Sequence, residues 1–599
     1  MSLPERSQID EKYKWSLEDF YSSLSSWEEE FQVASTQVSD IEAYKGRLGE
    51  GALTVRLAIE TYLTNVRRIE RLYTFAHMRS DEDTTNSQSL SILDQAGGLF
   101  SRFSAASSFL LPELLDLPAT VSEKYLQDKL LAPYKRMLDE ILRFRPYTLS
   151  KEEENILALG GEIFGGADKI FSQLNNADFK FGKITVGGVE KELTHGTLTT
   201  FLKNPDKEIR RTAYKQFYDV YLSHQNSLAA IYSTSVKTDC YLAQGKKHDS
   251  ALQRALFPDR VVTGVYNGLV ESASTSLGAL HDYYQFRKER LNLSEVTLAD
   301  THVPLIADVK THYPYEKAIE TLLAAFAPLG EEYCSILEKG VRAERWVDVF
   351  ETKNKRSGAY CSGCYDSRPY VLMNYKEENL SDLFTLAHEL GHAMHAELTS
   401  RNQSYQDHHF GIFVAEVAST FNEQLLLAHL RKEHSKDPQM MAYLLNHQLD
   451  EIKAMFYRQT MFAEFELITH EMVESRKAIT TDSLKESYTA LLKKYFGPAV
   501  SISENNWIEC LRIPHFYSAF YVYKYATGLS AALTLSDAVL ANEPGAQGRY
   551  LNFLSSGASK PPLDLLDEAG VNMTDGKATK KTAQIFADRL KQLRTVLKG

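Results

Sequence analysis

Apolar residues recur at three- and four-residue steps over most of this 599-residue chain, which is the spacing of a buried helix face. The pattern is clear in residues 208–236, 416–434 and 582–598. Only 17 residues are prolines, so few positions interrupt a long helix. The sequence therefore predicts a mainly α-helical fold.

Charge and composition exclude several classes of function. The formal net charge is −12 and no long cluster of lysine and arginine is present, which argues against a nucleic-acid-binding surface. No uncharged apolar run is long enough to cross a membrane, and the first residues lack the apolar core of a signal peptide. Five cysteines in so long a chain do not make a disulfide framework. We expect a cytoplasmic protein without nucleic-acid or membrane partners, and leave its oligomeric state open.

Two short segments interrupt the helical pattern. Residues 180–196 alternate between apolar and polar side chains around a Gly-Gly pair, which predicts a β-hairpin. Residues 368–375 form a second strand candidate. The hairpin is also the best candidate for a domain boundary, and it separates a helical region at 1–195 from the remainder at 196–599.

The most specific motif is His388-Glu389-x-x-His392. Residues four apart lie one turn from each other on the same helix face, so both imidazoles can reach one metal ion. Glu389 is rotated by about 100° and can meet a water on that ion without binding the ion itself. Zinc peptidases use this arrangement with the glutamate as general base. Because the bare pattern arises by chance in about one such chain in twenty-five, a third ligand is needed to support it.

Spacing tests several candidates for that ligand. One group of zinc enzymes has a third histidine six residues after the second, but Leu398 stands there in this chain. His395 lies two turns beyond His388, so we interpret it as a packing or ligand-supporting histidine. Glu397 falls on the opposite face of the helix.

Glu416 and Glu423 are stronger candidates. They are seven residues apart, hence on one face of the next predicted helix, among apolar side chains. A buried carboxylate costs several kcal/mol unless it is paired or bound to a metal. Two histidines and one glutamate make a catalytic zinc site. Glu416 follows His392 by 24 residues, which is far enough for a turn and an antiparallel return, so we assign Glu416 as the ligand. Glu423 is then the partner of a ligand histidine. The alternative is that both glutamates lie on a solvated edge.

The segments AHELGHAMH (387–395) and FVAEVASTFNEQ (413–424) resemble the thimet-oligopeptidase-like zinc metallopeptidases, in their oligoendopeptidase F branch. Five further segments resemble that branch in matching order: YKWSLEDFY, KNPDKEIRRTAYKQFYDVY, SGAYCSGCYDSRPYVLMNY, PHFYSAFYVYKYATG and SSGASKPPLDLLDEAGVN. The likeness thus covers nearly the whole chain.

This resemblance implies a large helical zincin-type fold with a deep substrate channel and a small β-sheet beside the zinc helix. Residues 1–195 would be an N-terminal helical lid, and residues 196–599 the catalytic domain. It also implies one zinc ion per chain, with His388, His392 and Glu416 as ligands and Glu389 as general base.

Aromatic residues are concentrated in 514–528. Tyr517, Tyr521 and Tyr525 lie one turn apart, which aligns hydroxyls that need partners if they are buried; an aromatic face packed in the core is the alternative. The resemblance implies a histidine and a tyrosine of this segment near the scissile carbonyl. We assign these roles to His515 and Tyr523, with Tyr521 as the second choice.

Peptide substrates need a surface for their backbone. An edge strand at 368–375 would bind them by adding a strand, with Gly358 allowing close approach and Tyr517 and Tyr521 as further contacts. The Cys-x-x-Cys pair at 361–364 has neither a second pair at zinc-ribbon spacing nor a βαβ pattern around it, so we interpret it as two loop thiols rather than a redox or zinc motif.

These features predict a zinc-dependent endopeptidase that hydrolyses internal bonds of short, unfolded oligopeptides. Two alternatives stay open at this point. A helical zinc carboxypeptidase would need a cationic side chain at the channel end for the terminal carboxylate. A non-enzymatic helical protein would carry the motif by chance, and a stoichiometric metal assay would identify it.

Overall fold

The computed structural model describes residues 3–306 and 309–598. The chain forms two compact units, each assembled from three segments. The first unit comprises Met1–Thr148, Lys310–Leu430 and Leu535–Gly570, and the second comprises Leu149–Val309, Arg431–Thr534 and Val571–Gly599. The domain boundary near residue 195, the lid and the channel stay predictions.

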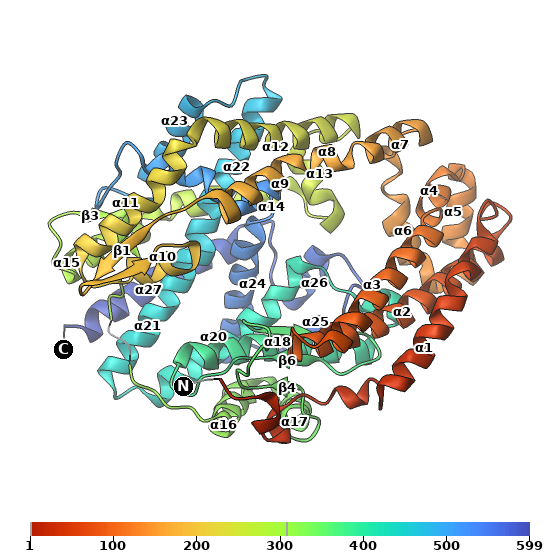
Figure 1. Cartoon of the computed structure of the whole chain (residues 1–599), viewed down its shortest axis with the longest axis horizontal. Coiled ribbons are helices and arrows are strands. Elements are labelled where there is room, and N and C mark those ends of the chain that lie inside the picture. The colour runs from red at the N-terminus through yellow and green to blue at the C-terminus, as the bar shows by residue number, and fades with distance from the viewer. Residues whose placement is uncertain (1–2, 307–308, 599) are drawn as a thin grey trace. The chain divides into compact units, whose positions relative to one another are not determined.

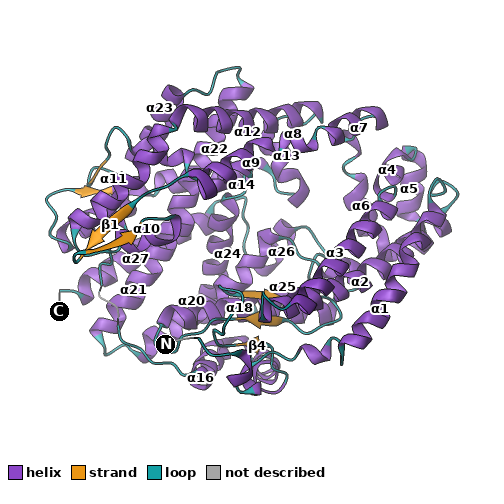
Figure 2. Ribbon diagram, viewed as in Figure 1, coloured by secondary structure: helices purple, strands orange, loops and turns teal. Residues whose placement is uncertain are grey.

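Helices dominate both units, which confirms the mainly α-helical fold (Figure 1, Figure 2). The helices that begin in the first unit are α1 (Leu24–Gln37), α2 (Ala52–Glu82), α3 (Ser87–Ser107), α4 (Leu110–Asp116), α5 (Ala119–Gln127), α6 (Lys135–Leu142), α16 (Tyr315–Phe326), α17 (Glu331–Glu338), α18 (Leu380–Asn402), α19 (Tyr405–His408), α20 (Ile412–Glu433), α25 (Ala546–Ser555) and α26 (Pro562–Ala569).

The second unit is also mainly helical. Its helices are α7 (Lys151–Leu159), α8 (Gly161–Phe164), α9 (Gly166–Gln173), α10 (His195–Leu202), α11 (Lys207–Ser223), α12 (Gln225–Gly245), α13 (Ala251–Leu256), α14 (Thr263–Thr275), α15 (Leu277–Arg290), α21 (Pro438–Ile452), α22 (Gln459–Glu474), α23 (Thr481–Phe496), α24 (Tyr523–Leu540) and α27 (Lys577–Val596). Within residues 3–306 and 309–598, no helix is both long enough and apolar enough to cross a bilayer.

The predicted hairpin is confirmed in the second unit. Strands β1 (Lys183–Val186) and β2 (Val189–Glu192) pair in antiparallel register, with Val186 opposite Val189. Gly187 and Gly188 form the turn with φ of +60° and +82°, a conformation that glycine adopts without a steric penalty. Strands β3 (Val296–Thr297) and β7 (Val500–Ser501) form a short parallel pair in the same unit.

A three-stranded sheet precedes α18 in the first unit, as the resemblance implies. Its order is β4 (Val347–Asp348), β6 (Tyr370–Leu372), β5 (Tyr360–Ser362), with β6 parallel to β4 and antiparallel to β5. The prediction of an edge strand at 368–375 is therefore wrong, because β6 is fully buried and paired on both sides. Strand β5, which contacts α18, lies at an edge instead.

Buried charges hold the N-terminal segment against this sheet. The Asp348 carboxylate lies 2.6 Å from Arg6 and 2.6 Å from Lys355, whose side chain is completely buried. Burial by itself would raise the pKa of Asp348, but the two cations keep it below its usual value. The amide of Val349 also donates to the Tyr13 carbonyl at 2.9 Å. Residues more than 330 positions apart thus fix the sheet that leads into α18.

Candidate metal centre

Helix α18 presents His388 and His392 on one face. The helix begins after Asn379, whose side chain accepts a hydrogen bond from the Ser381 amide at 3.1 Å. The two imidazole rings lie 4.9 Å apart, centroid to centroid, and meet edge to face. Both are half-buried, so they are accessible to an ion yet partly shielded from water.

Helix α20 adds a carboxylate to the same point. The Glu416 Oε2 atom lies 3.4 Å from Nε2 of His388 and 3.8 Å from Nε2 of His392. Ligand atoms about 2.1 Å from a tetrahedral zinc ion are about 3.4 Å from one another, so this donor set fits such an ion. The predicted ligands are therefore brought together from two helices, with one donor atom of each residue within 4.8 Å of the others.

Gly391 allows the two helices to approach this closely. A Cβ atom at this position would lie 2.6 Å from Cα of Ser419 and 2.7 Å from the carbonyl oxygen of Ala418, both on α20. The buried amide of Asn422 also donates to the Ala387 carbonyl across the same contact at 3.4 Å. The role of Gly391 was not predicted from the sequence. The sequence feature that indicates it is a glycine inside a strongly helical segment, because glycine there lowers helix stability by about 1 kcal/mol relative to alanine.

Glu423 lies behind His388. Its Oε1 atom is 2.6 Å from Nδ1 of His388, so this hydrogen bond directs the Nε2 atom of the ring toward Glu416. Burial alone would lower the pKa of His388, but the hydrogen bond and charge of Glu423 raise it to about 9. One turn away, burial and the nearby His388 lower the pKa of His392 to about 3.

Glu389 is 7% exposed and is not one of the three residues whose donor atoms converge. Burial raises its pKa to about 7, with the charge of His388 opposing this shift and those of Glu416 and Glu423 adding to it. A carboxyl group with a pKa near neutrality can both take up and release a proton, as a general base must.

His395 packs in the core instead of joining the donors. Its ring stacks on Phe410 with centroids 3.7 Å apart, and lies 5.6 Å from Phe553 of α25. A cavity of about 420 Å³ opens next to this region, and its wall includes His392, Cys361 and Cys364. Of the three donor residues, His392 lines this cavity.

Comparison with known proteins identifies the family. The sequence profile of "Peptidase family M3" matches residues 200–585, and that of "Oligopeptidase F" matches residues 113–181. The chain is 40% identical to oligopeptidase PepF of Bacillus subtilis (strain 168) over 598 residues, which covers 99% of this chain and 89% of that protein. The chain belongs to peptidase family M3.

Other relatives are similar to this M3 peptidase along nearly its whole length. An oligoendopeptidase F homolog of Borreliella burgdorferi is 35% identical, with 99% of each chain covered. The crystal structure of oligoendopeptidase-F from Enterococcus faecium superposes with a TM-score of 0.74 at 33% identity, covering 96% of this chain and 99% of that one. The protein is accordingly a metalloendopeptidase, and family membership implies a metal ion.

The predicted carbonyl-binding residues lie in the second unit of the peptidase. The ring of His515 has its centroid 6.3 Å from that of Tyr521 and 6.2 Å from that of Tyr525, and the two tyrosine rings are 5.6 Å apart. His515 is exposed, but its partial burial lowers the pKa of its imidazole. The structure thus gathers His515, Tyr521 and Tyr525 into one cluster.

Tyr523 and Tyr517 do not join this cluster. Tyr523, the first residue of α24, is fully buried, with its ring 5.3 Å from that of Tyr266. Tyr517 stacks on Phe171 with centroids 4.5 Å apart. For both, the alternative of core packing describes the environment better than substrate contact does.

Gly358 lies in the first unit, in the loop before β5. Its φ of +87° requires glycine, and its carbonyl accepts a hydrogen bond from Nδ2 of Asn374 at 2.8 Å. A Cβ atom at this position would meet nothing within 4 Å. Gly358 thus shapes the turn, and its contact with substrate stays a prediction.

The close contact at Gly391 gives a testable prediction. Gly391→Ala should push α20 away from α18, which should remove most of the bound metal and lower stability by about 1–3 kcal/mol, as overpacking does. Metal content after dialysis and the thermal midpoint measure these effects. Gly98→Ala in α3 is the control, because a Cβ there meets nothing within 4 Å. If Gly391→Ala kept its full metal content, the close approach would not be needed to hold Glu416.

Proposed function

We propose that this metalloendopeptidase is a zinc enzyme that hydrolyses internal bonds of short, unfolded oligopeptides, with one catalytic zinc ion bound by His388, His392 and Glu416. The observation that supports this proposal is the convergence of two imidazoles and one carboxylate, with the Nε2–Oε2 distances of 3.4 and 3.8 Å. Two nitrogen donors and one oxygen donor, with room for a fourth ligand, are typical of catalytic rather than structural zinc.

A zinc ion held by these residues would polarise the scissile carbonyl and acidify the attacking water. Glu389 accepts the proton of that water on its carboxylate and then donates it to the leaving nitrogen. Burial raises the pKa of Glu389, which makes its carboxylate a better base for the first step. Glu423 holds His388 in the tautomer that leaves Nε2 free to bind the metal.

We assign the stabilisation of the oxyanion to His515, together with Tyr521 of the same cluster. A hydroxyl or imidazole N–H aimed at the developing negative charge lowers the barrier to acyl transfer. Tyr521 replaces Tyr523 in this assignment, because Tyr523 is fully buried. Tyr525 is the second tyrosine near His515, with ring centroids 6.2 Å apart.

Short peptides are the proposed substrates, and the cytoplasm the proposed compartment. Relatives named oligopeptidase or oligoendopeptidase support the first assignment. The cavity next to His392, of about 420 Å³, has room for a few side chains rather than a folded domain. The absence of disulfides among the cysteines Cys240, Cys334, Cys361, Cys364 and Cys510 is compatible with a reducing compartment.

Replacing the general base tests the mechanism. Glu389→Gln should bind one equivalent of zinc while the rate falls by about 10²- to 10⁴-fold, because the shape is kept and proton transfer is lost. Steady-state cleavage of a fluorogenic peptide and metal analysis measure both quantities. Glu397→Gln is a matched control on α18, since Glu397 pairs with Arg401 away from the donors. A Glu389→Gln enzyme with more than a tenth of the wild-type rate would exclude this role.

The two glutamates of α20 should differ in effect. Glu416→Ala should abolish stoichiometric zinc binding, whereas Glu423→Ala should cost about 10- to 100-fold in affinity, as loss of a ligand's supporting hydrogen bond does. Glu423→Gln is the control, because the amide oxygen still accepts from Nδ1 of His388. Zinc affinity is measured by competition with a chelating dye. The reverse ranking of zinc affinities would show that Glu423, and not Glu416, is the metal ligand.

Substrate length and folding provide a further test. Opening a folded domain costs roughly 5–15 kcal/mol, which a free peptide does not require. We expect efficient cleavage of a flexible peptide and no cleavage of the same sequence grafted into a rigid surface loop of a stable carrier. Cleavage products are followed by mass spectrometry, with the heat-unfolded carrier as a positive control. Equal rates for the free and grafted sequences would contradict the restriction to unfolded peptides.

A further inference from the structure

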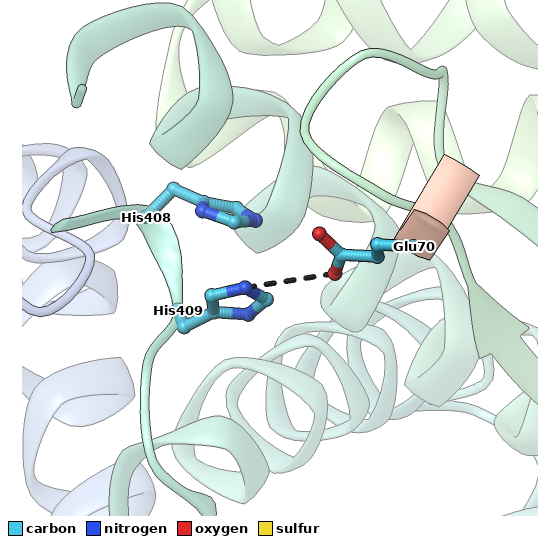
Figure 3. A group of neighbouring side chains, drawn as sticks. All are labelled: Glu70, His408 and His409. Carbon is cyan, nitrogen blue, oxygen red and sulfur yellow. Dashed lines mark ion pairs between the residues drawn. The ribbon is translucent and has the colours of Figure 1, made fainter. Parts of the chain in front are cut away.

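A second cluster of metal-binding side chains lies in the first unit, away from the His-Glu motif. Glu70 comes from α2, His408 ends α19, and His409 follows it directly. Figure 3 shows the two imidazole rings and the carboxylate turned toward one another. One donor atom of each residue lies within 4.8 Å of the others, and Nε2 of His409 is 3.5 Å from Oε1 of Glu70.

Tyr405 orients two of the three side chains. The Nδ1 atom of His408 lies 2.6 Å from the Tyr405 carbonyl, so Nδ1–H donates and Nε2 keeps its lone pair. The hydroxyl of Tyr405 donates to Oε2 of Glu70 at 2.9 Å, which leaves Oε1 available toward His409. These are the supporting hydrogen bonds that metal ligands commonly have in proteins.

The charged and titratable groups around the cluster are compatible with a bound cation. Burial raises the pKa of Glu70 and lowers those of His408 and His409, so neutral imidazoles face a poorly solvated carboxyl group. In the described part of the chain, no lysine or arginine pairs with Glu70. The nearby guanidinium of Arg67 pairs with Asp366 and lies over the Tyr365 ring, 4.6 Å from its centroid.

We propose that Glu70, His408 and His409 bind a second divalent transition-metal cation, for which Zn²⁺ is the probe. Two imidazoles and one carboxylate match the donors that zinc prefers, and the 3.5 Å between His409 and Glu70 is close to the separation of about 3.4 Å around a tetrahedral zinc ion. The His409 side chain is 63% exposed, so it can turn to complete the site. The third such group, at His312, is exposed, with 4.0 Å to its carboxylate, and has no comparable support.

A cation at this site would join α2 to the connection between α18 and α20. That connection, residues 403–411, lies between the helix of the two motif histidines and the helix of Glu416. All three side chains also line the cavity whose wall includes His392. The second ion would therefore hold the wall of that cavity in place and stabilise the folded state by binding it selectively.

The test counts metal ions in the full-length protein. After removal of metal with a chelator, titration with Zn²⁺ followed by calorimetry should give two equivalents for the wild type. Glu70→Gln and His409→Ala should each give one, because losing a ligand costs more than the roughly 10- to 100-fold that follows loss of a supporting hydrogen bond. The Gln side chain still accepts the Tyr405 hydrogen bond, and His409 is exposed, so neither change threatens folding.

Matched controls separate this site from the catalytic one. His312→Ala removes a histidine of similar exposure, 61% against 63%, and should keep both equivalents. His388→Ala should lose the other equivalent and leave the one that depends on Glu70. A wild type whose single equivalent is lost in His388→Ala, or a second equivalent that persists in both Glu70→Gln and His409→Ala, would overturn the proposal without affecting the catalytic assignment.

Discussion

The contact between α18 and α20 at Gly391 is the constraint on which the metal centre depends. A side chain at this position would place its Cβ 2.6 Å from the α20 backbone, so only glycine lets the helices meet there. The approach brings Glu416, which follows His392 by 24 residues, to 3.4 Å from His388. The helix propensity lost at a glycine, about 1 kcal/mol, is small beside what convergent metal ligands contribute.

The two motif histidines show how far neighbours decide the chemistry of a side chain. They lie one turn apart with similar burial, yet the pKa of His388 is raised to about 9 and that of His392 is lowered to about 3. The difference arises because Glu423 contacts only His388, at 2.6 Å. With Glu389 and Glu416 nearby as well, three carboxylates share one partly buried region. Such a concentration of negative charge is costly unless a cation balances it.

The connection between α18 and α20 is anchored from two directions. The carbonyl of Asp407 accepts a hydrogen bond from the Ala558 amide at 2.7 Å, next to Gly557, where a Cβ would clash with that carbonyl. On the other side, Tyr405 is bonded to Glu70 at 2.9 Å. Residues 403–411 are therefore held by contacts with α2 and with the turn after α25.

Local patterns in the sequence determined the helical fold, the hairpin around Gly187 and Gly188, and the shared helix face of the motif histidines. These follow from the repeat of the helix and the conformational freedom of glycine, which act over a few residues. The resemblance carried by the motif segments correctly indicated the family. The apolar pattern around Glu416 and Glu423 drew attention to both, because charge on a buried face needs a partner, and the structure places both carboxylates near His388.

Only the tertiary structure decided which elements became neighbours. Strand β6 is central rather than at an edge, since β4 and β5 pair with it from opposite sides, and nothing within residues 368–375 encodes those partners. Tyr523 is buried while Tyr521 and Tyr525 flank His515, because the chain changes from a turn to a helix within that segment. Glu70 meets His408 and His409 across more than 330 residues. Contacts of this kind depend on the packing of whole helices, which short-range spacing does not specify.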